Sequence, residues 1–420
     1  MLFLILNNKF QMTIIFGYAK IFGMKKIIIA IISVLFLQLG VAAQDNNLTF
    51  LYINGSNNND KKMKDWYIKG VNKLHPVMKK KFEKNSSIKK WTKDNKLVID
   101  ESPAIFFWGY DSKTDLDFVK DRLNISKAFS STLAYEIRSL LTQFMHDAIW
   151  VQKTHNMLPI LDDLNETVKA QTDGDKSVIL FGYSAGTFVN YQYMMYKFRY
   201  INLYELFKVL NADEEILEFV KANPQKNTCL SALSYDKGNI GVISNTEHLV
   251  LNQNKEELKA NYLQLDKVSE KYCAPEGKVK GVVNFASPIP LFYSDMAEDH
   301  YEYNFYGKYM IKYILENGIY FLTVNFREDP LGFPTSRNLT IEQIEDLADV
   351  KIENPSGVIY DNSHVWSRRS AFLAHTSYWS ARGTFANGVV KSFVNGTKFQ
   401  YDKKYQQKVL KRKNKKSEVL

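Results

Sequence analysis

One serine of the chain lies in a pattern that suits nucleophilic chemistry. Ser184 is at the centre of residues 182–186, which read Gly-Tyr-Ser-Ala-Gly. A short apolar segment at 177–181 precedes it directly, and a helix-like pattern at 187–200 follows. A serine on so sharp a strand-to-helix turn needs small neighbours, and the turn lifts its hydroxyl above the sheet. This context predicts that Ser184 is a nucleophile, and an ordinary tight turn is the alternative.

A serine hydroxyl is a poor nucleophile until a base takes its proton, and a carboxylate usually orients that base. Asp329 follows directly on the predicted strand at 319–325. The carboxyl ends of parallel strands form the edge where substrate-facing loops gather. We therefore predict Asp329 as the acid. Glu328, whose side chain could point elsewhere, and Asp295, after the preceding strand, are the alternatives.

Two histidines lie well past this strand and could serve as the base, His364 and His375. Both could reach the serine from a loop. We favour His375, partly on a family resemblance that is described below, and keep His364 as the alternative base. The remaining histidines lack the chain order serine, acid, histidine. They are predicted to be exposed or in the core: His75, His146, His155, His248 and His300.

An oxyanion site needs two backbone N–H groups near the serine. The N–H of Ala185 begins the helix after Ser184 and can face a developing oxyanion. We predict the second donor in the Asn-Gly-Ser-Asn turn after the first strand, at Gly55 or Ser56. The loop at 108–110 after the next strand is the alternative.

Strand-like and helix-like segments alternate along the chain. Strands are predicted at 48–53, 104–108, 177–181, 281–285, 319–325 and 358–360. Helices are predicted at 61–83, at 131–144, onward to about 170 with a bend or restart near Pro159, and at 187–200. Such alternation predicts an α/β fold with a mostly parallel sheet flanked by helices. Residues 201–275 are less regular and are predicted to be an insertion after the nucleophile helix.

The motifs together resemble the α/β-hydrolase superfamily, in which serine, acid and histidine follow in this chain order. Residues 284–288, Asn-Phe-Ala-Ser-Pro, are similar to the Phe-Gly-Ser-Pro run of fungal-type (class three) lipases. Residues 329–334, Asp-Pro-Leu-Gly-Phe-Pro, resemble their acid loop, and His375-x-x-Tyr378 resembles their histidine segment. Those lipases usually carry histidine and leucine beside the serine, where this chain has Tyr183 and Ala185. The resemblance covers roughly residues 48–380 through short, scattered motifs.

This resemblance implies a hydrolase domain over residues 44–400 that cleaves a small-molecule or lipid ester through an acyl-enzyme. It implies no metal and no organic cofactor. Residues 201–275 could form a cap or lid over the acyl pocket. A thioesterase, an amidase and an acyltransferase can share this machinery. A catalytically silent binding or envelope-associated protein is the alternative from another class.

The N-terminal segment, residues 1–43, contains the pattern of a secretory signal peptide. Lys25 and Lys26 precede an apolar run at 27–37, and small residues follow at 41–43. The apolar run is too short for a permanent membrane anchor. We predict a start at Met24, cleavage near Ala43, and a secreted or periplasmic protein. Residues 1–23 fit no such pattern.

The chain holds two cysteines, Cys229 and Cys273. In an exported protein they could pair and close the segment between them. Two separate buried thiols are the alternative.

The formal charge of +10 is partly clustered in a basic tail at 401–420. Such tails are usually solvated and locally disordered, and weak contact with an anionic membrane surface is the alternative. Nucleic-acid binding is not expected, because the basic residues do not alternate with aromatic ones in one motif.

Overall fold

A computed structural model of the chain describes residues 46–417, with gaps at 57–60, 109–114, 120, 122–134, 136–145, 148, 235–240, 244–248, 252–253, 293–304 and 337. Contacts divide the chain into two units, Met1–Asn46 and Asn47–Leu420. The second unit carries the fold described below. The predicted signal peptide lies outside the described residues, as does the helix predicted at 131–144 apart from Tyr135.

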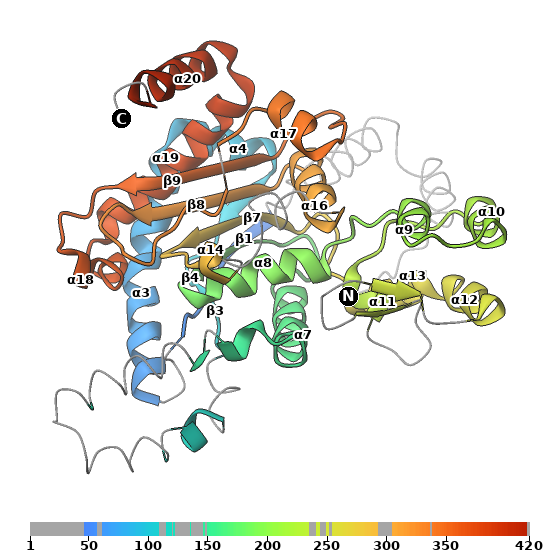
Figure 1. Ribbon diagram of the computed structural model, residues 1–420. Helices are drawn as coiled ribbons and strands as arrows, with labels where there is room; N and C mark the ends of the chain where they lie inside the picture. The colour runs from blue at the N-terminus through green and yellow to red at the C-terminus, as the bar shows by residue number, and fades with distance from the viewer. Residues whose placement is uncertain are drawn as a thin grey trace, which may run out of the picture. The chain divides into compact units, whose positions relative to one another are not determined.

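The described residues of the second unit are built on a seven-stranded sheet (Figure 1). Its strands run in the order β2-β1-β4-β7-β8-β9, with β3 also paired to β1. The pairs of β1 with β3 and β4, of β4 with β7, of β7 with β8 and of β8 with β9 are all parallel. The strands are β1 (Asn46–Ile53), β2 (Leu97–Ile99), β3 (Ala104–Phe106), β4 (Ser177–Tyr183), β7 (Val279–Phe285), β8 (Tyr320–Phe326) and β9 (Val358–Val365).

Helices cover both faces of this sheet. The helices outside the predicted insertion are α3 (Lys61–Lys84), α4 (Ser86–Asp94), α7 (Thr154–Gln171), α8 (Ala185–Lys197), α14 (Ile289–Phe292), α16 (Phe305–Glu316), α17 (Ile341–Ala348), α18 (Ala371–Ala374), the short 3₁₀ helix η1 (Ser377–Trp379), α19 (Arg382–Tyr401) and α20 (Lys403–Ser417). In Figure 1, α8 lies in front of the sheet, and α3 and α19 lie behind it.

Each strand supplies side chains to two hydrophobic cores, because successive side chains of a strand point to opposite faces. On β4, Val178 and Leu180 join the core under α7, α8 and α16. Ile179 and Phe181 join the other core, under α3 and α19. Every residue of β4 and β8 is buried, which explains why these strands read as continuous apolar runs rather than alternating ones.

The predicted architecture is confirmed at the level of an α/β fold with a mostly parallel sheet between helices. Strands β4, β7 and β8 lie within two residues of their predicted bounds, and β9 is longer than predicted. The prediction missed β2, whose three residues are too few to show a period. Pro159, near which a bend or restart was predicted, lies in the second turn of one continuous helix, α7.

The described residues of 201–275 are largely helical, more regular than predicted. The region contains α9 (Leu203–Val209), α10 (Glu214–Ala222), α11 (Leu230–Ser234), α12 (Lys255–Tyr262) and α13 (Leu265–Tyr272), with a small antiparallel pair of β5 (Gly241–Ile243) and β6 (Leu249–Leu251). The helices are short, and the side chains of Asn202, Asp213 and Asn254 cap three of them. Helices of two or three turns hold too few residues for a clear 3.6-residue period, which explains the wrong prediction.

The described part of this region lies at the end of α8 that is remote from Ser184 (Figure 1). Ala274 N–H donates to the carbonyl of Lys197, the last residue of α8, at 2.7 Å. The Lys169 ammonium, in the last turn of α7, donates to the carbonyl of Lys271 at 2.6 Å. Thirteen residues of α8 separate this end from Ser184, a length of about 20 Å. These contacts of the described residues lie away from Ser184, and the cap or lid stays a prediction.

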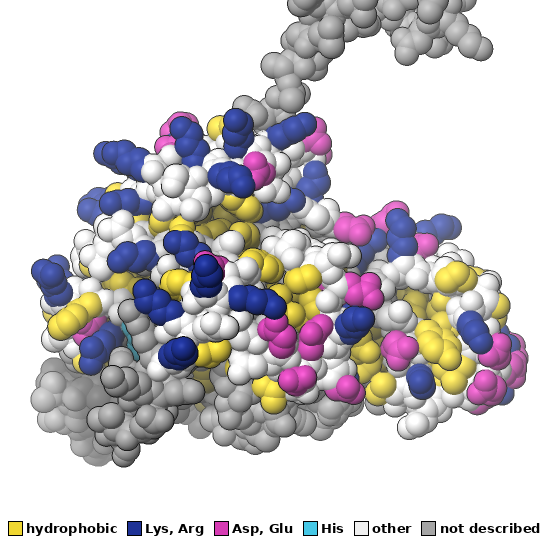
Figure 2. Space-filling model, turned by 90° about the horizontal axis from the view of Figure 1, so that it is seen from above, with side chains coloured by type: hydrophobic (Ala, Val, Ile, Leu, Met, Phe, Trp, Pro, Cys, Tyr) yellow, Lys and Arg dark blue, Asp and Glu magenta, His cyan; other side chains and the backbone are white. Residues whose placement is uncertain are grey.

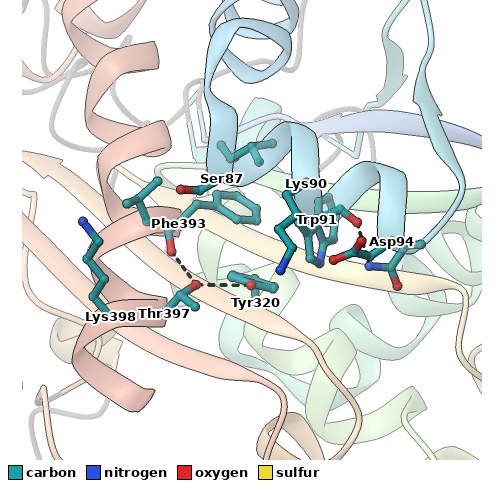
Figure 3. A pocket seen from close by; sticks show the side chains of 11 residues that line it. Ser87, Lys90, Trp91, Asp94, Tyr320, Phe393, Thr397 and Lys398 are labelled. Atoms are coloured by element: carbon teal, nitrogen blue, oxygen red, sulfur yellow. Dashed lines mark hydrogen bonds between the residues drawn. The ribbon is translucent and has the colours of Figure 1, made fainter. Parts of the chain in front are cut away.

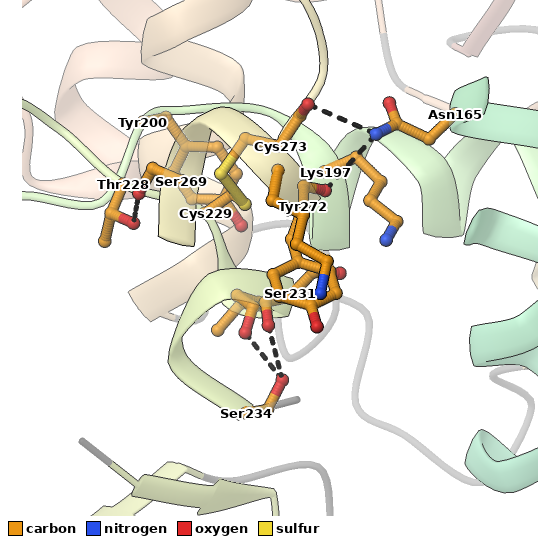
Figure 4. Close-up of a disulfide and its surroundings, with 12 residues drawn as sticks. Asn165, Lys197, Tyr200, Thr228, Cys229, Ser231, Ser234, Ser269, Tyr272 and Cys273 are labelled. Carbon is orange, nitrogen blue, oxygen red and sulfur yellow. Dashed lines mark hydrogen bonds between the residues drawn. A yellow bond between two sulfur atoms is a disulfide. The ribbon is translucent and has the colours of Figure 1, made fainter. Parts of the chain in front are cut away.

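A disulfide joins Cys229 to Cys273 within this region (Figure 4). Both cysteines are buried. Asn165, on α7, donates from its side-chain amide to the carbonyl of Cys273 at 3.2 Å. The Thr228 and Ser269 hydroxyls are hydrogen-bonded at 2.6 Å beside the bridge. The predicted pairing is confirmed. The bridge joins the start of α11 to the end of α13, and the Asn165 hydrogen bond links it to α7.

The basic tail is helical over α20, contrary to the predicted local disorder. Asp402 begins this helix, because its carboxylate accepts from the N–H groups of Lys404 and Tyr405 at 3.0 and 3.1 Å. Figure 2 shows Lys and Arg side chains spread over much of the visible face, with acidic side chains more frequent on its right. Within the described part of the chain, none of the helices combines the length and apolar character needed to cross a membrane.

Removing the disulfide should destabilise the protein. The bridge spans 44 residues, and closing a loop of this length restricts the unfolded chain by about 4 kcal/mol in the chain-entropy description. The double variant Cys229→Ala/Cys273→Ala should therefore unfold at lower urea concentration than the wild type. Dithiothreitol should lower the urea midpoint of the wild type and leave that of the variant unchanged. Equal midpoints for both proteins, with and without dithiothreitol, would contradict the expectation.

Candidate active site

Ser184 sits on the turn between β4 and α8, in a backbone conformation that few residues adopt. Its φ and ψ are 51° and −124°. A Cβ on Gly182 would lie 2.7 Å from the carbonyl oxygen of Gly186, and one on Gly186 would lie 2.5 Å from the carbonyl oxygen of Asn54. Both positions therefore exclude any side chain. The Ser184 N–H donates to the carbonyl of Phe285 at 3.0 Å, which holds the turn against β7.

His375 lies between Ser184 and Asp329. Its Nε2 is 3.0 Å from Ser184 Oγ, and its Nδ1 is 3.0 and 3.2 Å from the two oxygens of Asp329. When the Nδ1 proton faces the carboxylate, Nε2 is free of its proton and accepts from the serine hydroxyl. The Asp329 side chain is fully buried, whereas 19% of the His375 side chain is exposed. The structure thus brings together the three residues of the predicted order.

Backbone and side-chain donors hold Asp329 in place. The Tyr378 hydroxyl donates to its Oδ2 at 2.9 Å, and Leu331 N–H donates to its Oδ1 at 2.9 Å. The same Tyr378 oxygen accepts from Phe326 N–H at 2.8 Å, and the two rings stack with centroids 4.1 Å apart. Burial, with the charge of Asp329, raises the pKa of Tyr378, so its hydroxyl keeps the proton that it donates.

Tyr183, the residue before the serine, holds the segment that carries the histidine. Its hydroxyl donates to the backbone carbonyl of His375 at 3.0 Å. Its ring lies 5.6 Å from the His375 ring and 5.1 Å from the Trp379 ring, centroid to centroid. Burial and the nearby Asp329 charge raise the pKa of Tyr183, so it too remains a donor. The sequence showed Tyr183 only as a departure from the lipase pattern.

The turn after β1 lies directly against the serine. A Cβ built on Gly55 would be 2.8 Å from the Cβ of Ser184 and 2.9 Å from the carbonyl oxygen of Tyr183. The Asn54 side chain, which is fully buried, accepts from the backbone N–H of Trp108 at 2.9 Å. The Trp108 indole donates to the carbonyl of Asn54 at 2.7 Å. The turn predicted to complete the oxyanion site is thus fixed beside Ser184, and sequence reasoning missed the role of Asn54 and Trp108 in fixing it.

The alternatives for the acid and the base occupy other places. His364 is exposed on β9. Glu328 accepts from the N–H and hydroxyl of Ser367 at 3.0 and 2.9 Å, so it ties two loops together. Asp295 lies outside the described residues, as do Gly109 and Tyr110 of the alternative oxyanion loop. Of the other histidines, His75 is buried with its Nε2 3.1 Å from the carbonyl of Asp100.

A buried polar network supports the loop that carries the acid. The Ser287 hydroxyl donates to Thr187 at 3.2 Å and is 3.1 Å from the Thr335 hydroxyl. Thr187 in turn donates to the carbonyl of Ser184 at 2.7 Å. At the far end of the network, Asp361 accepts from Thr335 N–H at 2.9 Å. The network therefore connects the serine turn with β9.

Asp361 is the titratable member of this network. Burial raises its pKa to about 6, although hydrogen bonds from Ser363 and from Thr335 N–H act in the opposite direction. Its Oδ1 accepts from the Ser363 N–H and hydroxyl at 3.0 and 2.6 Å.

A cavity of about 310 Å³ lies elsewhere, between α4, α19 and the start of β8 (Figure 3). Trp91, Tyr320 and Phe393 provide its aromatic wall, and Lys90 and Lys398 lie at its margin. Tyr320 is the first residue of β8, whereas Asp329 follows the last, so this cavity is at the other edge of the sheet from the triad. Among the described residues, no group of three or more His, Cys, Asp or Glu side chains is placed to hold a metal ion.

Compared with models of protein families, with curated proteins and with solved structures, the chain matches none. The geometry of the site therefore carries the functional argument.

The raised pKa of Asp361 predicts a measurable pH effect on stability. Between its ordinary pKa near 3.8 and its folded pKa of about 6, the folded state binds the proton and the unfolded state releases it. Folding thus loses stability as pH rises through this window, by about 3 kcal/mol for two pKa units. From pH 4 to pH 7, the unfolding free energy of Asp361→Asn should therefore rise relative to that of the wild type. The exposed control Asp346→Asn should show no such shift, and a pH-independent difference for Asp361→Asn would contradict the expectation.

Proposed function

We propose that this chain is a serine hydrolase of the α/β-hydrolase kind that cleaves carboxylic esters through an acyl-enzyme. The observation that carries the proposal is the position of His375, 3.0 Å from the hydroxyl oxygen of Ser184 and 3.0 Å from the carboxylate of Asp329. A nucleophile, a base and a group that orients the base are the three parts that acyl transfer requires. The parallel sheet and the position of the serine on a strand-to-helix turn also support the proposal.

In the first step, the Ser184 oxygen attacks the ester carbonyl carbon while His375 Nε2 takes the hydroxyl proton. The resulting imidazolium is stabilised by the buried carboxylate of Asp329. The tetrahedral intermediate collapses, and the C–O bond to the alcohol breaks as the imidazolium returns the proton to the leaving oxygen. Water then attacks the acyl-enzyme by the same route and releases the acid.

The negative charge on the carbonyl oxygen needs donors that are already in place. The Ala185 N–H begins α8, and the first N–H groups of a helix have no acceptor within it. The turn at Gly55 and Ser56 lies directly against the serine, held there by Asn54 and Trp108. We assign the oxyanion site to Ala185 together with Gly55 or Ser56.

We also propose that the protein works outside the cytoplasm. The disulfide between Cys229 and Cys273 supports this proposal, because disulfides persist in oxidising compartments. The predicted signal peptide leads to the same place.

A fluorophosphonate probe tests the proposed nucleophile directly. The probe should label the wild type on Ser184, because the activated oxygen attacks phosphorus as it attacks a carbonyl carbon. Ser184→Ala should not be labelled and should not hydrolyse short esters, while circular dichroism shows the same fold. A folded wild type that neither reacts with the probe nor cleaves any ester, thioester or amide of a panel would identify a silent binding protein instead.

The two histidines form a matched pair for testing the base. His375→Ala should lower kcat for a short ester by at least about 10³-fold, because the serine then lacks a proton acceptor. His364→Ala removes an exposed imidazole from β9 and should change kcat less than twofold, within the ordinary effect of a surface substitution. Comparable losses in both variants would refute the assignment of His375.

A further inference from the structure

Arginine is unevenly distributed in this chain. The chain contains 46 lysines and 9 arginines. Residues 327–382 hold 5 of these arginines and a single lysine, Lys351. The rest of the chain uses lysine for almost all of its positive charge. This stretch also contains Asp329 and His375. Arginine thus predominates over lysine in the part of the chain that supplies the acid and the base.

Three of these arginines lie on loops that lead directly to the acid and the base. Arg327 follows β8 and precedes Asp329 by two positions. Arg368 and Arg369 lie between β9 and α18, the short helix that ends just before His375. All three are exposed.

Hydrogen bonds fix the backbone of both loops. Arg327 N–H donates to the carbonyl of Val365 at 2.8 Å. Glu328 accepts from Ser367 N–H at 3.0 Å and from Arg368 N–H at 3.4 Å. Arg368 has a φ of 60°, a conformation that residues other than glycine adopt uncommonly.

Among the described residues, these guanidinium groups have no acidic partner. Within the described part of the chain, no carboxylate oxygen lies within 4.0 Å of a side-chain nitrogen of Arg327, Arg368 or Arg369. Glu328, the residue that follows Arg327 in the sequence, accepts from backbone and hydroxyl donors instead. The Arg327 guanidinium lies over the Trp366 ring, 5.9 Å from its centroid.

We propose that these three arginines bind an anionic group of the substrate, a carboxylate or a phosphate, beside the ester that Ser184 attacks. The inference rests on the proposed hydrolase function. Guanidinium presents paired N–H donors in a planar fork that matches the two oxygens of such a group, which an ammonium does not. Because the backbone of both loops is already ordered, binding has to fix only the arginine side chains. The substrate is thus an anionic ester rather than a neutral one.

Matched pairs of esters test this inference. Methyl 4-acetoxybenzoate and 4-acetoxybenzoate differ by a charge on the alcohol side, and 4-nitrophenyl hexanoate and mono-4-nitrophenyl adipate differ by a charge on the acyl side. In at least one of the two pairs, kcat/KM should be at least about 10-fold higher for the anionic ester than for its neutral partner. A charge-assisted hydrogen bond has an effect of this size. Comparing 4-acetoxyphenylphosphonate with 4-acetoxybenzoate distinguishes a phosphate-like group from a carboxylate as the preferred anion.

Arg368→Ala/Arg369→Ala should reduce that preference by about 10-fold or more, mainly through KM, and Arg368→Lys/Arg369→Lys should restore only part of it. Lys89→Ala/Lys90→Ala on α4 removes the same two charges from exposed positions and should leave the preference unchanged. Equal loss in this control would overturn the inference, because net charge alone would then explain the preference.

Failure of the inference and failure of the hydrolase proposal give different results. Labelling of Ser184 with no preference for either anionic ester overturns the inference alone, and so does arginine-dependent binding to anionic phospholipid vesicles without a substrate preference. If the wild type is neither labelled nor active, calorimetry with Ser184→Ala decides separately. Binding of 4-acetoxybenzoate, the adipate ester or the phosphonate that is lost in the arginine double variant supports the anion site, and no binding of any of them overturns it.

Discussion

The left-handed backbone at Ser184 is the constraint on which the rest of the site depends. Holding a side-chain-bearing residue at a φ of 51° costs on the order of 1–3 kcal/mol, so the surroundings must impose it. They do so by close backbone packing. Gly186 touches the carbonyl of Asn54, and the Ser184 N–H is bound by Phe285 of the neighbouring strand. Three strands of one parallel sheet therefore determine where a single hydroxyl points.

An aromatic cluster holds the acid and the base relative to that hydroxyl. Tyr183 reaches from the serine turn to the His375 carbonyl, and Tyr378 reaches from the histidine segment to Asp329. Phe285 and Phe385 pack against the Tyr378 ring from β7 and α19. Each tyrosine thus contributes apolar area to the core and one directed hydrogen bond to the site. Because these rings are buried, the triad depends on the core and is insulated from changes at the surface.

The two edges of the sheet have different chemical characters. The carboxyl edge carries the strained turn, the triad and the exposed arginines. The opposite edge carries the disulfide-linked helices α11 and α13 and the aromatic cavity near Tyr320. A segment inserted after α8 would lie over Ser184 if that helix ended near the serine. Because α8 runs the full depth of the sheet away from Ser184, its C-terminal end delivers the next residues to the opposite edge.

The sequence by itself determined the parallel α/β fold, the turn at Ser184 and the identity of its neighbours, because these follow from local patterns. Buried parallel strands appear as apolar runs, and a strained turn reveals itself through Gly182 and Gly186. The short helices of 201–275 were missed because their signals are local but brief. Only the tertiary structure decided between His375 and His364, since both follow the last long strand at distances that loop length cannot rank. It alone also showed that Tyr183 and Tyr378 hold the triad and that the described end of the insertion contacts the end of α8 remote from Ser184. Those facts depend on contacts between residues separated by up to 192 positions, and such contacts form only when the sheet assembles.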